Sequence, residues 1–240
     1  GAYNSYKGSL WDQDIFPIDT YKALMSYRGS PLADSHENKD WSECRDHVRK
    51  YGMRNSNVMA IAPTATIGYI NGVEQSIEPN FSTLFVYENK SGNFYIMNEY
   101  FVNDMKKEGL WTPDIIKMVK EVDGDIALLN GMLPAWIKNK YKTAFDRDMF
   151  TLIKCNGVRQ KWIDQGISFN LYNKTTSLKY LNDIYMAAWE EGLKTTYYLR
   201  NRGASKVEKS TNKSEKEMDA TASACSIEAM INGDICESCQ

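Results

Sequence analysis

The sequence contains no long apolar run, few histidines and no excess of charge of either sign. No stretch approaches the 18 or so apolar residues of a membrane-spanning helix, and the first residues show no signal-peptide pattern. Lysine and arginine total 29 against 31 aspartates and glutamates, a net charge of -2. This balance argues against a dedicated nucleic-acid-binding protein, which usually carries a basic face. We therefore expect no direct binding to DNA or to a membrane.

Cysteine is also scarce and unevenly placed. The chain has 5 cysteines, an odd number, and three of them fall within the last 16 residues. A secreted disulfide framework would distribute its cysteines through the fold, so we expect a cytoplasmic protein in a reducing compartment. The chain begins without methionine, and its start reads like the middle of a domain.

One unit recurs along the chain: an amphipathic helix, a glycine and a short apolar strand. Glycine fits each helix end because the residue past a helix often takes a positive φ. The alternation favours an α/β architecture, either an open sheet or a barrel. The three units comprise a helix over 40–51, Gly52 and a strand near 58–62; a helix that ends at Gln165, Gly166 and a strand over 167–172; and a helix that ends at Glu191, Gly192 and a strand over 193–199.

Two further elements have local signals. Thr112 followed by Pro113 predicts the start of another helix, since threonine caps and proline suits the first turn. The run 81–95 predicts a hairpin that turns at 90–93. After Arg202 the chain is rich in Ser, Thr, Lys and Glu, and it cannot bury enough apolar surface to fold. We therefore expect a folded domain over 1–202 and a disordered, flexible tail over 203–240.

The first candidate site is the stretch Pro63, Thr64, Ala65, Thr66 and Ile67. Small and hydroxyl residues that follow a strand and start a helix leave backbone N–H groups free to bind an anion. The same residues are also compatible with an ordinary loop capped by threonine, and no established phosphate-loop pattern is present.

The second candidate is the adjacent pair Tyr197 and Tyr198. Two neighbouring phenols can pass an oxidising equivalent, but 15 tyrosines in 240 residues make one such pair a chance expectation. Neighbouring side chains of a regular strand point to opposite faces, so a relay requires the strand to twist or end there.

The third candidate is the terminal dithiol of Cys236 and Cys239, with Cys225 upstream. Three cysteines and two distant histidines make a poor zinc site, and no helix can follow Cys239 as in a thioredoxin fold. A flexible coil over 202–236 reaches about 30 Å, enough for a mobile dithiol to visit a buried pocket. Cys44, Cys155, Glu74 and Glu78 receive no role, the two glutamates being interpreted as structural or solvated.

Taken together, four stretches resemble the large (α) subunit of class I ribonucleotide reductase. They are "YGMRNSNVMAIAPTATIG" with "GVEQSIEP", "RQKWIDQGISFNLY", "GLKTTYYLRNR" and the terminal "CESCQ". The motifs "APTATI", "KTTYYLR" and "ACSIE" are similar to those of the bacterial and phage-type class Ia branch. The resemblance implies the C-terminal half of a ten-stranded α/β barrel and an oxidoreductase that reduces ribonucleoside diphosphates by thiyl-radical chemistry.

The resemblance also implies the role of each candidate. Pro63 to Ile67 match the loop that holds the substrate's phosphates. Tyr197 and Tyr198 match the stacked pair that relays the radical, and Cys236 and Cys239 match the dithiol that re-reduces the active-site disulfide. No metal or cofactor is expected on this chain, because the family's radical comes from a separate metal-containing small (β) subunit.

The family's partners follow in the same way: a second large subunit, the small subunit, and thioredoxin or glutaredoxin. The family's thiyl-forming cysteine, its reducing cysteine pair and its allosteric sites lie upstream of these motifs and are missing here. We therefore expect a fragment or one half of a split large subunit, inactive without its N-terminal part. Two alternatives stay open: a cobalamin-dependent class II reductase, and a zinc-stabilised interaction module built on Cys225, Cys236 and Cys239.

Overall fold

The computed structural model describes residues 1–30, 40–89 and 92–201. The described residues lie within one unit, Gly1–Ser205. The predicted tail over 203–240, with its terminal dithiol, lies outside the described residues, so the boundary near residue 202 stays a prediction.

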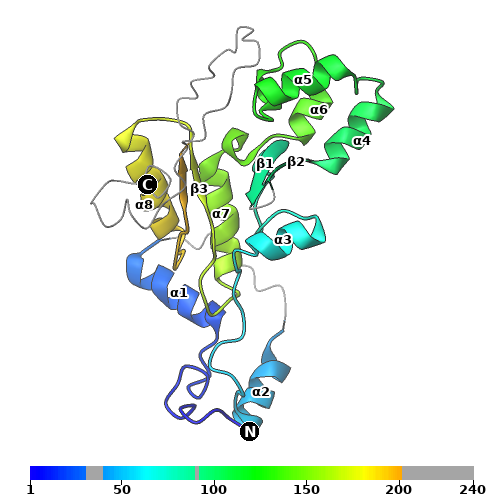
Figure 1. The fold of residues 1–240 in the computed structure, drawn as a ribbon. Coiled ribbons are helices and arrows are strands. Elements are labelled where there is room, and N and C mark those ends of the chain that lie inside the picture. The colour runs from blue at the N-terminus through cyan, green and yellow to red at the C-terminus, as the bar shows by residue number, and fades with distance from the viewer. Residues whose placement is uncertain (31–39, 90–91, 202–240) are drawn as a thin grey trace, which may run out of the picture. The chain divides into compact units, whose positions relative to one another are not determined.

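Helices dominate the described ranges, and the strands are short (Figure 1). The helices are α1 (Pro17–Arg28), α2 (Ser42–Tyr51), α3 (Ala65–Asn71), α4 (Glu99–Lys107), α5 (Pro113–Glu121), α6 (Ala135–Lys140), α7 (Met149–Gln160) and α8 (Leu178–Glu190). The strands are β1 (Leu84–Asn89), β2 (Gly92–Met97), β3 (Leu171–Asn173) and β4 (Leu199–Asn201), and short 3-10 turns cover Ile126–Leu128 and Ala144–Asp146.

The three predicted strands lie side by side and run parallel. β3 pairs with β4, with Leu171 opposite Leu199. Ile61 forms a parallel bridge with Ile167, and Ser168 N donates to Ile61 O at 2.8 Å. Segments 59–61, 165–173 and 195–201 thus run alongside one another in parallel, with a regular ladder only between β3 and β4 and an isolated bridge at Ile61. Each segment is preceded by a helix in sequence, as an α/β barrel requires.

The main core lies between these strands and their helices. α7 and α8 pack together against β3 (Figure 1). Ile153 on α7, Ile184 on α8 and Leu171 on β3 are each 0% exposed. Their packing follows from the one apolar face that each helix presents, and it fixes β3 in place.

A second apolar cluster surrounds the predicted hairpin. β1 and β2 pair antiparallel with Leu84 opposite Met97, which confirms the hairpin. Phe101 on α4, Val119 on α5 and Ile137 on α6 are each fully buried in this cluster. α5 begins as predicted: the Thr112 hydroxyl accepts the Ile115 N–H at 3.3 Å, and Pro113 opens the helix.

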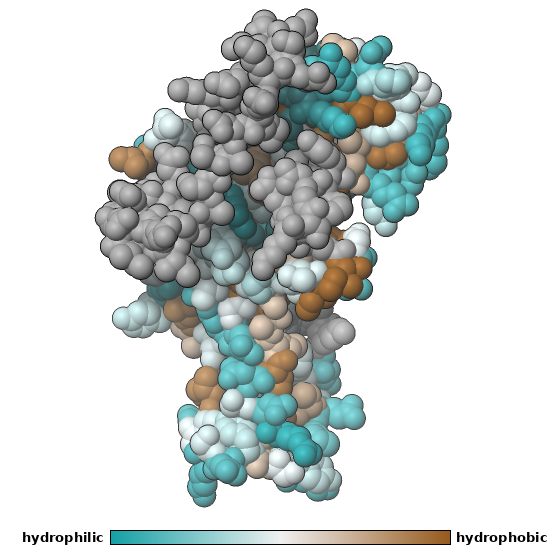
Figure 2. All heavy atoms as spheres, viewed as in Figure 1, coloured by the Kyte–Doolittle hydropathy of each residue, from teal (hydrophilic) through white to brown (hydrophobic). Residues whose placement is uncertain are grey.

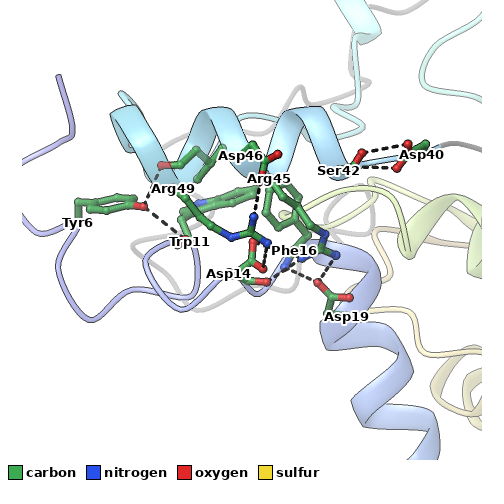
Figure 3. Close-up of polar contacts among 11 residues, drawn as sticks. Tyr6, Trp11, Asp14, Phe16, Asp19, Asp40, Ser42, Arg45, Asp46 and Arg49 are labelled. Carbon is green, nitrogen blue, oxygen red and sulfur yellow. Dashed lines mark hydrogen bonds and ion pairs between the residues drawn. The ribbon is translucent and has the colours of Figure 1, made fainter.

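Charged groups join α1 to α2 (Figure 3). Arg45 donates to Asp19 Oδ2 at 2.7 Å, and its guanidinium lies 4.5 Å above the Phe16 ring. Arg49 contacts Asp14 Oδ2 at 2.8 Å. The hydrogen bond from Arg49 is the main reason that the pKa of Asp14 lies below its usual range.

Several predicted boundaries were wrong. α7 ends at Gln160 rather than Gln165, and β4 begins at Leu199 rather than at residue 193. The predicted strand over 58–62 is reduced to the bridge at Ile61. Side chains replace part of the backbone ladder here, since Asp164 accepts the Val58 N–H at 2.7 Å. α2 and α8 end close to the predicted positions, and Gly52 and Gly192 take φ values of 73° and 76° as expected.

Gly166 is needed for a reason other than the one predicted. It does not end a helix, and its φ is not among the positive values in the described residues. A Cβ at Gly166 would lie 2.4 Å from Thr195 Oγ1. The missing side chain therefore lets Thr195 approach, and Thr195 Oγ1 accepts the Ile167 N–H at 3.1 Å and donates to Ile167 O at 3.0 Å.

Candidate functional site

The stretch Pro63 to Ile67 forms a tight turn into α3. Thr64 takes a left-handed φ of 48°, and α3 begins at Ala65. The Thr64 side chain holds the turn closed, since its Oγ1 accepts the Ser76 N–H at 2.8 Å. The backbone carbonyl of Thr64 accepts the Gly68 N–H at 2.6 Å. This confirms the predicted helix start, and it uses the Thr64 hydroxyl oxygen to brace the loop.

The first turn of α3 contains backbone N–H groups of the kind that bind anions. Ala65, Thr66 and Ile67 are exposed. Their N–H groups belong to the first turn of α3, where no intrahelical acceptor exists. Gly68 beneath them is buried, and a Cβ there would lie 2.9 Å from the carbonyl oxygen of Val73. Glycine therefore allows the loop to fold back on itself beneath the first turn of α3.

Tyr197 and Tyr198 lie with their rings in contact. Their ring centroids are 4.1 Å apart at an interplanar angle of 50°, and the Tyr197 hydroxyl donates to the Tyr198 hydroxyl at 3.4 Å. Neighbouring side chains meet because the regular strand starts only at Leu199. The condition that the sequence set for a relay, a strand that ends or twists at this pair, is met.

The backbone of the pair is fixed while the phenols stay accessible. Tyr197 N donates to Phe169 O at 2.8 Å, and Tyr198 O accepts from Leu171 N at 2.9 Å. The two side chains are 43% and 51% exposed. The hydrogen bond to Tyr198 is the main reason that the pKa of the Tyr197 phenol is raised. Arg200 places its guanidinium 4.6 Å above the Tyr198 ring.

A polar network that the sequence did not reveal supports the pair. Glu78 accepts hydrogen bonds from Asn170 N at 2.6 Å, from Asn170 Nδ2 at 2.9 Å and from the Tyr172 hydroxyl. Asn170 Oδ1 in turn accepts the Tyr198 N–H at 3.2 Å. Burial first, and the bond to Glu78 second, raise the pKa of Tyr172. Of the two interpretations given for Glu78, the structure selects the structural one.

One signal in the sequence points to this network. Asn170 stands between Phe169 and Leu171 in the predicted strand, and an amide buried in a strand needs hydrogen-bond partners. The partner cannot be found from spacing, because Glu78 lies 92 residues away along the chain.

The cysteines divide between described and undescribed parts of the chain. Cys225, Cys236 and Cys239 lie outside the described residues, so the dithiol and zinc hypotheses stay predictions. Cys44 on α2 and Cys155 on α7 are free and exposed thiols. Within the described ranges, no group of three or more His, Cys, Asp or Glu side chains is arranged to hold a metal ion. No helix in this part of the chain is long and apolar enough to cross a membrane.

Comparisons with known proteins agree with the resemblance seen in the sequence. The family described as "Ribonucleotide reductase, barrel domain" matches residues 1–199. A "Ribonucleoside-diphosphate reductase subunit alpha" of Chlamydia pneumoniae is 47% identical over 212 residues, which cover 88% of this chain and 20% of that protein. A "Ribonucleoside-diphosphate reductase large subunit" of Plasmodium falciparum is 32% identical over 214 residues, covering 88% of this chain and 25% of the relative.

A solved structure gives the same result for the fold. The Actinobacillus ureae class Id ribonucleotide reductase alpha subunit matches with a TM-score of 0.55 and 25% identity, over 81% of this chain and 37% of that one. The chain spans about a fifth of the length of the chlamydial relatives. With the family matched over nearly all the described residues and the parallel α/β arrangement in place, the chain belongs to the ribonucleotide reductase barrel-domain family.

Proposed function

We propose that this chain is the part of a ribonucleoside-diphosphate reductase large subunit that supplies the phosphate loop, a tyrosine relay and a shuttle dithiol. The completed enzyme reduces ribonucleoside diphosphates to deoxyribonucleotides by radical chemistry. The observation that carries the proposal is the contact between the two adjacent phenols, whose hydroxyl oxygens are 3.4 Å apart. An ordinary strand would send these side chains to opposite faces.

The relay needs one electron and one proton at each step. When Tyr198 is a phenoxyl radical, the hydroxyl hydrogen bond gives the proton of Tyr197 a direct path to the Tyr198 oxygen. Transfer of that proton with one electron restores Tyr198 to a phenol and leaves the radical on Tyr197. The oxidising equivalent enters from a separate metal-containing small subunit, so the contact favours class I over the cobalamin-dependent class. The narrower class Ia assignment stays a prediction.

The loop of Pro63, Thr64, Ala65, Thr66 and Ile67 would hold the substrate's phosphates. Two features support this role: exposed residues at the start of a helix, whose first N–H groups have no intrahelical acceptor, and a place directly after Ile61, which bridges in parallel to Ile167. In α/β folds, ligands bind where the carboxyl ends of parallel strands open. Backbone N–H groups in this position attract phosphate oxygens without a lysine or arginine.

Cys236 and Cys239 would return electrons to the active site. Two thiols become one disulfide, and the two electrons and two protons they release reduce the active-site disulfide to two thiols. Thioredoxin or glutaredoxin then reduces the tail in the same way. A double Cys236→Ser/Cys239→Ser variant should stop after about one turnover per site with thioredoxin as reductant. Dithiothreitol, small enough to enter the site, should restore multiple turnovers; full activity with thioredoxin alone would disprove the shuttle.

We infer that the enzyme works in the cytoplasm. The free and exposed thiols of Cys44 and Cys155 support a reducing compartment. The partners would be the remaining large-subunit sequence, a second large subunit, the small subunit and the dithiol reductant.

The proposed function is tested by reconstitution. The chain is combined with the upstream part of its large subunit and with the small subunit, and reduction of ribonucleoside diphosphates is measured with dithiothreitol. We expect turnover by the completed enzyme and none by the 240-residue chain with the small subunit alone. Turnover without the upstream part, or a completed enzyme with no reductase activity, would contradict the proposal.

A further inference from the structure

Glu78 belongs to the segment that follows α3, and its carboxylate contacts the strand region around β3. It accepts one hydrogen bond at Oε1, from the Asn170 N–H, and two at Oε2, from Asn170 Nδ2 and the Tyr172 hydroxyl. Asn170 is 3% exposed and Tyr172 is 5% exposed. An ionised carboxylate only accepts hydrogen bonds, so all three buried donors are matched.

The Asn170 side-chain amide connects Glu78 to the backbone of Tyr198. Its nitrogen faces Glu78 at 2.9 Å, and its oxygen therefore faces the Tyr198 N–H at 3.2 Å. A turned amide would set its NH2 group against the Tyr198 N–H, donor against donor. Glu78 thus determines which end of the amide faces Tyr198.

We propose that Glu78 is a positioning residue for the tyrosine pair, acting through the Asn170 amide on the backbone of Tyr198. The proposal rests on the relay function proposed above. Glu78 touches neither phenol of the pair, and it works by holding the chain so that the two rings meet.

The same segment also braces the phosphate loop. Ser76, two residues before Glu78, donates its N–H to Thr64 Oγ1 at 2.8 Å and its hydroxyl to Ser168 O at 3.0 Å. Segment 76–78 therefore contacts both the phosphate loop and the strand that holds the tyrosine pair.

The sharpest perturbation is Glu78→Gln, which changes hydrogen-bond polarity with almost no change in size. The new side chain has one accepting oxygen and one NH2 group, so it cannot match three donors. We expect the Asn170 amide to turn and release Tyr198. The pKa of the Tyr197 phenol should then fall toward its ordinary value, because its raised pKa depends mainly on the bond to Tyr198.

The Tyr197 phenol is followed by carbon-13 NMR of the tyrosine-labelled chain during a pH titration. Tyr197→Phe and Tyr198→Phe identify the two resonances. In the completed enzyme, Glu78→Gln should lower kcat about tenfold with KM unchanged, the equivalent of one hydrogen bond. The matched control is Glu74→Gln, whose carboxylate, among the described residues, makes no hydrogen bond to Asn170, and this variant should leave both readouts at the parent values.

A polarity swap keeps the test valid if the single variant folds poorly. In Glu78→Gln/Asn170→Asp the glutamine amide donates to the new carboxylate, which still accepts the Tyr198 N–H, and the net charge is that of the parent. This double variant should restore the Tyr197 titration and most of the turnover. A lesion that only destabilises the fold would not be repaired by a second polar change.

The outcomes separate the two proposals. If Glu78→Gln leaves the Tyr197 titration unchanged, or if a folded double variant fails to restore it, the positioning role is overturned. If the titration shifts and recovers as expected but turnover never changes, Glu78 does position the pair and the relay function is wrong.

Discussion

The Gly166→Ala substitution tests the contact between the strand after α7 and the segment that leads to the tyrosine pair. The added Cβ would lie 2.4 Å from Thr195 Oγ1 and 3.0 Å from Thr195 Cγ2. The distance to Oγ1 is shorter than real Cβ contacts and the distance to Cγ2 is unusually tight, so Thr195 must move. Its hydroxyl is held by Ile167 on both sides, at 3.1 Å from N and 3.0 Å from O.

The cost has two parts. Overpacking by one methyl group costs about 1–3 kcal/mol. Each of the two hydrogen bonds broken when Thr195 moves contributes about 0.5–1.5 kcal/mol. We therefore expect Gly166→Ala to lower the free energy of unfolding by about 2–6 kcal/mol.

The assay is urea denaturation of four chains: the parent, Gly166→Ala, Thr195→Ala and the double variant. Truncating Thr195 removes both clashing atoms, so Gly166→Ala should cost less than about 1 kcal/mol in that background, a coupling that the double-mutant cycle isolates. An equal cost of Gly166→Ala in both backgrounds would refute the reasoning.

Three further predictions concern stability and the loop. Because Arg49 lowers the pKa of Asp14, the ionised carboxylate stabilises the fold above the ordinary aspartate pKa of about 3.9, and this contribution is lost as the pH falls through the lowered value. Asp14→Asn should remove that part of the acid dependence of stability, measured by urea titrations at several pH values. An unchanged pH profile would contradict this prediction. Ile153→Ala, at a fully buried position, should cost about 2–5 kcal/mol, whereas Ile70→Ala, 78% exposed on α3, should stay within about 0.5 kcal/mol by the same assay. Gly68→Ala should raise the KM of the completed enzyme for its nucleotide more than it lowers kcat, because the new Cβ pushes on the Val73 carbonyl beneath the loop; an unchanged KM would argue against phosphate binding there.

The exposure of Ile70 is the reason that we expect its truncation to have little effect on stability. Ile67, Ile70 and Val73 are all more than 60% exposed, and Figure 2 shows apolar surface in the region where Figure 1 places α3. Side chains that bury little area contribute little to unfolding free energy. The same substitution inside α7 removes atoms from a packed core.

Elements with local signals could be predicted from the sequence. Thr112 and Pro113 mark the start of α5 through their own hydroxyl and ring, and Gly52 and Gly192 mark helix ends through their own φ. The repeated unit of helix, glycine and strand also gave the α/β class, because alternating elements favour parallel pairing.

Features that depend on distant residues could not be predicted in this way. α7 ends at Gln160, although helix-compatible residues follow. At this end the Gln160 side chain donates to Gln165 O at 2.8 Å and accepts from Lys194 N at 3.3 Å, and the second contact spans 34 residues, so spacing does not reveal it. Glu78 reads as an ordinary carboxylate until Asn170 is brought against it. Spacing carries no information on a contact across 92 residues.

The central claim is that the contact between the two phenols carries the radical, and turnover of the completed enzyme with single hydroxyl deletions tests it most directly. Tyr197→Phe and Tyr198→Phe each remove one oxygen from a half-exposed pair, which costs at most about 1 kcal/mol of stability. Tyr185→Phe, at an exposed position on α8, is the matched control. We predict that both pair variants bind substrate and yet show no turnover, while the control turns over like the parent. Turnover in either pair variant equal to that of the control would contradict the claim.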